Sequence, residues 1–272
     1  MAKDPRQFLR GFIDEVLSGE IEKFRSFDFK QLKDNDKYGC PGRNFDCDDS
    51  EIIRAVYVVL WGELLPGLRM DNFGYRKQYR GDTMNTFHTM FGRETEEKPG
   101  SFAGLEKYAP SDELREKVRH FGRTYTVLGN YTVLPNFYAR QTTLNCYRGT
   151  NKWHDFFDIF LAELRKVLTG AGDQDDTLKE LVQVNSFCFR NFQGEDGVKR
   201  LVDGLFLNGY CCENTSQVRQ IFSMNHHWKD VSARERYLED AEHYLENAGK
   251  IISSRTEKML CALKEKLASP RA

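Results

Sequence analysis

Residues 125–136 have the sequence Tyr125-Thr-Val-Leu-Gly-Asn-Tyr-Thr-Val-Leu-Pro135-Asn136, which is rich in β-branched and aromatic residues, whereas the other strong periodicities of the chain are helical. Two β-rich runs meet at Gly129-Asn130, a pair suited to the positive φ angles of a tight hairpin turn. Pro135 has no backbone N–H to donate, so we expect the second run to be an edge strand. The stretch therefore predicts a β-hairpin inserted among helices.

The clearest helical pattern lies at residues 152–168, where large apolar side chains recur at intervals of three and four residues. The stripe consists of Trp153, Phe156, Phe157, Phe160, Leu161, Leu164, Val167 and Leu168. Shorter stripes of the same kind occupy residues 5–17, 52–60 and 197–207. Stripes of this width are typical of helices that face a core, so we expect the aromatic residues to be buried rather than to hold a cofactor.

Residues with helix-capping ability precede two of the predicted helices. Asp48-Asp49-Ser50 comes directly before the stripe at 52–60. Ser111 precedes a short apolar stripe that ends at Phe121, just before the hairpin stretch. Because Ser, Asp and an acidic first turn favour helix N-termini, we interpret the acidic residues near position 48 as caps rather than as metal ligands.

The last part of the chain, near residues 231–267, predicts one long helix. A stripe with near-heptad spacing runs through alternating Glu and Lys residues, at Tyr237, Ala241, Tyr244, Ala248, Ile251, Arg255 and Met259. Such a stripe can pack along the body of the protein or pair with a second chain. The run is short and holds two alanines, which favours packing within the chain.

The composition is that of a compact globular protein, with 40% hydrophobic and 30% charged residues in a chain of 272. A chain of this length can bury a sizeable core. We find no internal repeat, low-complexity segment or break in composition that would divide it. The expected fold is therefore one mainly α-helical domain, residues 1–272, with a small β-hairpin or sheet among the helices.

Charge and cysteine content narrow the classes of function. The 40 Lys and Arg residues nearly balance the 41 Asp and Glu residues, so no overall field attracts polyanions or an anionic membrane. The seven cysteines are odd in number and mostly far apart, which indicates reduced thiols. Residues 1–6 lack the apolar core of a signal peptide, and no apolar run approaches the roughly 18 residues that cross a bilayer. We expect a cytoplasmic protein with no membrane partner.

Residues 73–80 interleave aromatic side chains with cations, the combination that stacks on bases and neutralises phosphates. The tripeptide Tyr-Arg-Gly occurs at 79–81 and again at 147–149, and its glycine lets a phosphate approach the arginine closely. The candidate binding residues for a nucleic acid or nucleotide are Arg76, Tyr79, Arg80, Arg123, Asn130 and Arg148. The alternative is an ordinary solvated charged surface, which the near-neutral net charge favours.

Five side chains able to catalyse lie in polar segments, although no sequence motif assigns them to an enzyme class. These candidate catalytic residues are Asp82, His88, His120, His154 and Asp155. Asp155 and Asp158 are three positions apart on the polar face of the helix predicted at 152–168, where exposed carboxylates are the ordinary expectation. The pattern predicts no particular metal site or cofactor.

Five short segments occur in an order that a known family shares. They are Phe27-Asp-Phe-Lys30, Leu60-Trp-Gly-Glu-Leu-Leu-Pro-Gly67, Tyr125 to Pro135, Leu144-Asn-Cys-Tyr-Arg-Gly149 and Ile251 to Met259. In the order of these segments, across roughly residues 27–260, the chain resembles an uncharacterised bacterial family known only as a domain of unknown function. The resemblance implies a prokaryotic or phage-related cytosolic protein and supplies no activity.

Residues 128–134 are also similar to the Gly-Asn-Leu-Thr-Leu-Leu stretch of the HNH-like nuclease domain in modification-dependent restriction enzymes. In those domains a preceding His and an acidic residue bind the divalent metal that cleaves DNA. His120 lies upstream in this chain, but the Ile-Glu-His-Ile-x-Pro motif of those domains is absent. The similarity implies a degenerate or divergent metal-dependent nuclease.

Three functions follow as alternatives. The first is recognition of a nucleic acid or nucleotide by a bacterial cytosolic protein, in a defence or mobile-element context. The second is a non-catalytic interaction module whose C-terminal helix docks a protein partner or a second copy in a homodimer. The third is the divergent metal-dependent nuclease. The residues leave all three open.

Overall fold

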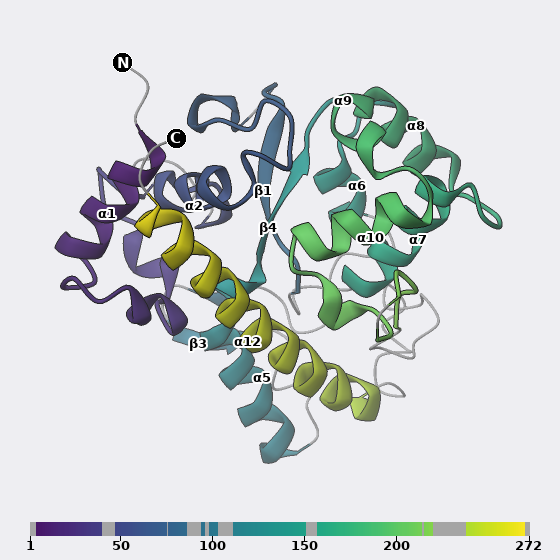
Figure 1. Cartoon of the computed structure of the whole chain (residues 1–272). Coiled ribbons are helices and arrows are strands. Elements are labelled where there is room, and N and C mark those ends of the chain that lie inside the picture. Colours follow the sequence, from purple (N-terminus) through teal and green to yellow (C-terminus); the bar gives the residue numbers. More distant parts are fainter. Residues whose placement is uncertain are drawn as a thin grey trace.

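The structure is a computed structural model in which helices dominate and two small antiparallel sheets, each of two strands, lie among them (Figure 1). The described residues are 4–39, 47–74, 76–85, 94–95, 98–102, 111–150, 157–213, 215–219 and 238–269. The α-helices are α1 (Pro5–Glu15), α2 (Glu51–Trp61), α5 (Asp112–Thr124), α6 (Leu144–Thr150), α7 (Phe157–Thr169), α8 (Asp176–Val184), α9 (Ser186–Phe189), α10 (Gly194–Gly204) and α12 (Leu238–Ala268). The strands are β1 (Tyr79–Thr83), β2 (Glu94–Thr95), β3 (Lys98–Phe102) and β4 (Tyr131–Pro135). Short 3₁₀ helices are η1 (Ile21–Arg25), η2 (Phe29–Leu32), η3 (Cys47–Asp49), η4 (Met70–Asn72), η5 (Leu128–Asn130), η6 (Arg190–Phe192) and η7 (Asn208–Tyr210).

A two-stranded ribbon runs through the middle of the molecule (Figure 1). It consists of β1 and β4 in antiparallel register, with Tyr79 opposite Pro135 and Thr83 opposite Tyr131. The N-terminal helices α1 and α2 pack together on one side of the ribbon, and α6 to α10 gather on the other. The long helix α12 crosses in front and contacts α2, α5, η5 and η7, so it joins the N-terminal helices to the segments that come before β4 and after α10.

The prediction of a β-hairpin at residues 125–136 is wrong. Only its second run is a strand, because residues 128–130 form a 3₁₀ turn and β4 pairs with β1. Gly129 does not have a positive φ, unlike the glycines of tight hairpin turns. A Cβ at Gly129 would lie 2.1 Å from the carbonyl oxygen of Ile252 in α12. The glycine is therefore required for the close approach of two backbones and not for a turn.

The amphipathic stripes predict the main helices correctly. α7 and α10 overlap the stripes at 152–168 and 197–207, and the predicted C-terminal helix is observed as α12. The first residues of the stripe at 152–168 lie outside the described residues. Both serine caps are confirmed, since Ser50 Oγ accepts from the backbone N of Ile53 at 3.4 Å and Ser111 Oγ from that of Leu114 at 3.1 Å. The stripes do not anticipate α6, α8 or α9.

The near-heptad stripe of α12 packs within the chain, as its short length predicts. Its described side chains are buried, at Tyr244, Ala248, Ile251, Arg255 and Met259. Tyr237 and the side chain of Ala241, which belong to the same stripe, lie outside the described residues. Because α12 contacts η1, η5, α2 and α5 along its length, its buried face is a large part of the core.

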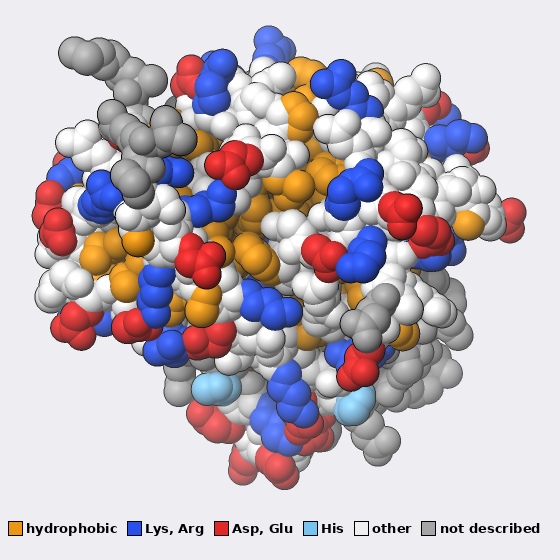
Figure 2. Space-filling model, in the orientation of Figure 1, with side chains coloured by type: hydrophobic (Ala, Val, Ile, Leu, Met, Phe, Trp, Pro, Cys, Tyr) orange, Lys and Arg blue, Asp and Glu red, His pale blue; other side chains and the backbone are white. Residues whose placement is uncertain are grey.

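The surface mixes charges of both signs. Figure 2 shows basic and acidic side chains next to one another over this face of the molecule, with apolar atoms between them. Several form ion pairs between separate elements, such as Lys266 of α12 with Glu63 at 3.1 Å. Among the helices that the structure describes, none combines the length and the apolar character needed to cross a membrane.

Candidate functional site

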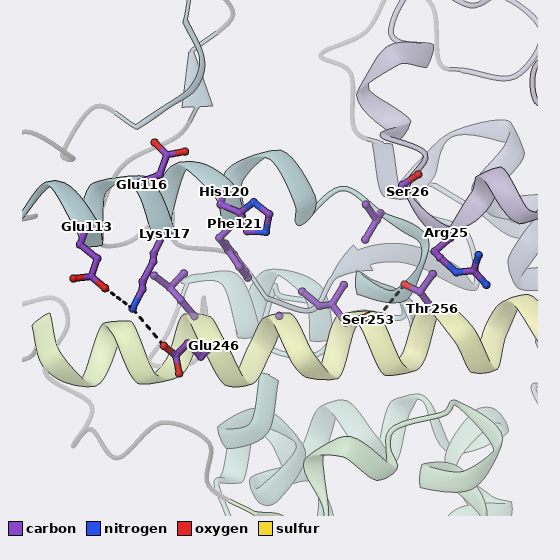
Figure 3. Close-up of a pocket in the computed structure, with 14 residues that line it drawn as sticks. Arg25, Ser26, Glu113, Glu116, Lys117, His120, Phe121, Glu246, Ser253 and Thr256 are labelled. Carbon is purple, nitrogen blue, oxygen red and sulfur yellow. Dashed lines mark hydrogen bonds and ion pairs between the residues drawn. The ribbon is translucent and has the colours of Figure 1, made fainter.

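A groove with a volume of about 700 Å³ lies between α5 and α12 (Figure 3). Its lining comes from three separate parts of the chain, namely the end of η1, the helix α5 with the residues just after it, and the middle of α12. Charged side chains lie at its two ends and apolar side chains lie between them. The groove therefore combines an apolar surface with polar groups, as small-molecule sites do.

The amphipathic sequence of α5 places one wall of the groove. Ser111 caps the helix, and acidic residues in its first turn are stabilised by the positive end of the helix dipole. Leu114, Val118 and Phe121 are buried along one side of the helix. Lys117 lies on the flank of this buried side and points toward α12 (Figure 3).

The other wall is a line of residues along α12. Leu245, Gly249, Ile252 and Thr256 recur at intervals of three and four, so they share one side of the helix. Leu245 and Ile252 are buried, as is Phe121 of the facing wall. The floor between the two helices is consequently apolar.

Gly249 leaves the middle of this floor open. It lies inside α12, where glycine lowers helix stability by roughly 1 kcal/mol relative to alanine. A Cβ at this position would meet no atom within 4 Å, so nothing in the described chain requires a glycine there for packing. Gly129 is the opposite case, because its missing Cβ is what lets η5 approach α12.

Lys117 closes one end of the groove by joining α5 to α12. Its ammonium group contacts Glu242 and lies 3.4 Å from the carboxylates of both Glu113 and Glu246. The hydrogen bond to Glu242 raises the pKa of Lys117, so the ammonium stays charged at neutral pH. Among the described side chains, three carboxylates thus share one ammonium group at this end of the groove.

Arg25 closes the other end by joining η1 to α12. Its Nη2 lies 2.9 Å from Oε2 of Glu257, and its Nε donates to the same carboxylate. This hydrogen bond lowers the pKa of Glu257, which keeps the carboxylate ionised. Glu22 accepts from Arg25 at 3.5 Å and also pairs with Lys264. Two cations and two carboxylates therefore balance at this end.

The wall formed by α12 is anchored to the residues that lead into the β ribbon. Thr256 Oγ1 accepts a hydrogen bond from the backbone N of Gly129 at 3.0 Å and donates to the carbonyl oxygen of Ile252 at 2.8 Å. Both partners are buried, so this hydroxyl is fully used within the protein. The wall formed by α12 is thus held in place by contacts on its core side.

The structure places three of the predicted site residues on β1, away from the groove. Tyr79 is fully buried, and its hydroxyl donates to the carbonyl oxygen of Pro66 at 2.8 Å. Arg80 is half-buried and Asp82 is buried. Residues two apart lie on the same face of a strand, so Arg80 and Asp82 are neighbours on one face of the ribbon.

Asn130 is fully buried in a network of hydrogen bonds. Its Oδ1 accepts from the backbone N of Asn85 at 3.0 Å, and its Nδ2 donates to the carbonyl oxygens of Asn85 at 2.8 Å and Tyr125 at 2.7 Å. The side chain of Asn85 in turn bonds to the hydroxyls of Tyr210 at 2.6 Å and Tyr244 at 2.7 Å. The network joins the start of β4 to η7 and α12, and these contacts hold the core together.

The remaining predicted residues are spread over the chain. Arg76 is exposed in the loop before β1 with a φ of 59°, whereas His120 lines the groove. The predicted residues whose side chains lie outside the described part are His88, Arg123, Arg148, His154 and Asp155. Within the described part, no group of three or more His, Cys, Asp or Glu side chains is arranged to hold a metal ion.

Sequence reasoning does not predict the groove, because its walls come from distant segments. Arg25, Lys117 and Glu246 carry no motif and become neighbours only through the packing of η1 and α5 on α12. Two local signals are present in the sequence. Glu113 and Lys117 have the spacing of an ion pair on one helix face, and Gly249 interrupts a long helical pattern without a turn to explain it.

A family model matches residues 26–259 of the chain, which is most of its length. The chain belongs to this family of unknown function, DUF6994. Membership of DUF6994 confirms the expected resemblance to an uncharacterised family over nearly the same residues, and it assigns no activity. The comparisons with curated proteins and with solved structures found no match.

Proposed function

We propose that this protein binds a small, elongated molecule with an apolar body in the groove between α5 and α12. The observation that carries the proposal is the open apolar floor at Gly249, inside a helix whose packing does not require a glycine there. The groove volume of about 700 Å³ falls within the roughly 300–1,000 Å³ typical of small-molecule sites. An apolar body placed on the floor would cover the apolar surface that the groove still exposes to water.

The two charged ends limit the length of the ligand. Along α12 the lining runs from Leu245 to Thr256, a distance of about 16 Å at the rise of an α-helix. Lys117 bridges to α12 at one end of this span and Arg25 at the other. A segment of a partner protein would have to enter and leave past these ion pairs, whereas a small molecule need not. The groove therefore favours a small molecule over a segment of a partner protein.

Nile red, a neutral dye whose fluorescence rises in apolar surroundings, tests this proposal. We expect saturable binding to the intact chain and a loss of at least about tenfold in affinity in Gly249→Leu, whose side chain would fill the floor. Ser254→Leu is the matched control, because it adds the same side chain at an exposed position of the same helix outside the groove. Unchanged binding in Gly249→Leu, or an equal loss in both variants, would overturn the proposal.

Recognition of a nucleic acid or nucleotide by arginines is a second proposal. It is supported by Arg76 and Lys77, which are adjacent and both exposed in the loop before β1. The near balance of 40 Lys and Arg residues with 41 Asp and Glu residues limits such a contact to a local one. We expect short single-stranded DNA or RNA, or ATP, to bind at low salt, to dissociate as salt rises, and to bind more weakly to Arg76→Ala. Undetectable binding at low salt would contradict it. The defence or mobile-element context rests on the sequence alone.

The two other sequence hypotheses need experiments suited to this structure. The stripe of α12, which the interaction hypothesis would place against a partner, is buried in the core of its own chain, so truncating the helix would expose that core. Sedimentation of the intact chain is therefore the appropriate test for a homodimer. The metal-dependent nuclease is tested by metal analysis and by DNA cleavage with added Mn²⁺, since His88, His154 and Asp155 lie outside the described residues.

A further inference from the structure

We infer that the ligand of the groove is a small cationic amphiphile whose charged group, such as an amine, lies beside the carboxylates of Glu113, Glu242 and Glu246. This inference rests on the proposed function and names the chemical class of the ligand. The apolar body lies along the floor over Gly249, and the cation occupies the end that Lys117 closes (Figure 3).

The end near Lys117 has an excess of negative charge. Among the described side chains, three carboxylates contact its ammonium group, which is two more negative charges than Lys117 balances. Lys117 cannot make this end more negative by losing its proton near neutral pH, because the hydrogen bond to Glu242 raises its pKa. The side chains of Glu242 and Glu246 are 39% and 49% exposed, so their charge remains accessible to a ligand.

The opposite end carries no such excess, so the charge pattern gives the ligand one orientation. Arg25 and Lys264 are balanced there by Glu22 and Glu257. A cation placed at that end would lie beside the Arg25 guanidinium, which is committed to Glu257 through two of its nitrogens. A cation at the Lys117 end is attracted by three carboxylates that share only one ammonium group, that of Lys117.

An anionic amphiphile has no equally good arrangement in this groove. Its apolar body could use the same floor, but its head would be repelled at the Lys117 end and would have to compete with Glu257 for Arg25 at the other. Because the carboxylates are partly exposed, the preference is a modest one that salt weakens. The preference for a cationic over an anionic head can therefore be measured separately from binding of the apolar body.

Three amphiphiles with the same ten-carbon chain test the inference, each used below its critical micelle concentration. Decyltrimethylammonium, decyl sulfate and the uncharged decyl maltoside would compete with Nile red for the intact chain. We expect the cationic compound to displace the dye at a concentration about tenfold lower than the anionic one, and added salt to narrow this difference.

Charge-neutralising variants connect the preference to this end of the groove. Glu246→Gln should narrow the difference between the cationic and anionic compounds to about threefold, whereas displacement by decyl maltoside should not change. Glu63→Gln is the matched control, since Glu63 is also a carboxylate on the surface paired with a lysine of α12, and it lies outside the groove. Constant displacement by the maltoside shows that the groove remains folded in each variant.

The outcomes separate this inference from the proposal beneath it. Equal displacement by the cationic and anionic compounds, or an unchanged difference in Glu246→Gln, would overturn the cationic ligand while leaving apolar binding in the groove intact. Absence of Nile red binding, or binding that Gly249→Leu does not reduce, would overturn both. A preference for the cationic compound that Glu246→Gln reduces and Glu63→Gln does not would support both.

Discussion

Arg255 donates from Nη1 to the carbonyl oxygen of Gly129 at 2.8 Å, and this contact joins the middle of α12 to the start of the β ribbon. The same nitrogen donates to the carbonyl of Tyr131 at 2.6 Å, and Nε donates to that of Leu205 at 3.1 Å. The guanidinium is buried and lies 5.5 Å from the ring of Trp61. Burial lowers the pKa of Arg255 to about 10, so the group remains a cation at neutral pH. Carbonyl dipoles and an aromatic face thus solvate a charge inside the core.

Replacing this arginine should lower stability strongly. Arg255→Met is expected to reduce the free energy of unfolding by about 3 kcal/mol or more, because three buried carbonyl oxygens lose their donor. Urea denaturation followed by circular dichroism measures the change. Lys250→Met, at an exposed position of the same helix, should stay within about 0.5 kcal/mol of the natural chain. A free energy of unfolding in Arg255→Met equal to that of the natural chain would mean that the three carbonyl oxygens find other donors.

Gly129→Ala should destabilise the protein for a steric reason. The added Cβ would lie 2.1 Å from the carbonyl oxygen of Ile252 and 2.7 Å from the backbone N of Thr256, so α12 and η5 would have to separate. We expect a loss of about 1–3 kcal/mol, the usual cost of overpacking, in urea denaturation. A loss close to zero would show that the two backbones can move apart freely.

Gly249→Ala should have the opposite effect on stability. Its Cβ meets no atom within 4 Å, and alanine is favoured over glycine in a helix by roughly 1 kcal/mol, so the free energy of unfolding should rise. The same methyl group would narrow the floor of the groove and weaken Nile red binding. Ser254→Ala controls for helix propensity at an exposed position of α12 and should leave dye binding unchanged. A lower free energy of unfolding in Gly249→Ala than in the natural chain would contradict the open space next to Gly249.

The sequence predicts the helices because each one must satisfy local requirements. A helix buries one stripe of side chains and needs acceptors for its first N–H groups, and both requirements appear as patterns within a few residues. Thus the serine before α5 and the stripe of α12 are recognisable in isolation. The strand pairing is not local. β1 has the sequence Tyr-Arg-Gly-Asp-Thr, with few typical strand formers, and its partner β4 is far along the chain.

The role of individual glycines depends on what lies next to them in the fold. Gly129 satisfies the sequence rule for a hairpin turn, yet it serves a contact with α12 that no local pattern reveals. Gly81 is similar, because a Cβ there would lie 1.8 Å from the carbonyl oxygen of Asp48. The groove is unpredictable for the same reason, since Arg25, Lys117 and Glu246 meet only in the folded chain.

Alkaline pH should destabilise the protein through Cys188. Burial raises the pKa of this thiol from 9.0 to about 12. Above pH 9.0 the unfolded chain therefore loses the Cys188 proton while the native chain keeps it, so the native state binds more protons. The free energy of unfolding should consequently fall as pH rises from 9.0 toward 12, by up to about 1.4 kcal/mol per pH unit from this group.

Urea denaturation at a series of pH values measures this slope. Above pH 9.0 the free energy of unfolding of Cys188→Ala should fall less steeply with pH than that of the natural chain. This holds whatever the stability of the variant at neutral pH, because the slope depends only on the difference in bound protons between the unfolded and native states. Cys261→Ala, which removes an exposed thiol of α12, is the matched control for the loss of a thiol. Thiol labelling at neutral pH gives an independent check, since Cys212 and Cys261 are exposed whereas Cys188 is buried and should react only on unfolding. Rapid labelling of Cys188 in the native protein, or an unchanged slope in Cys188→Ala, would contradict the buried, protonated thiol.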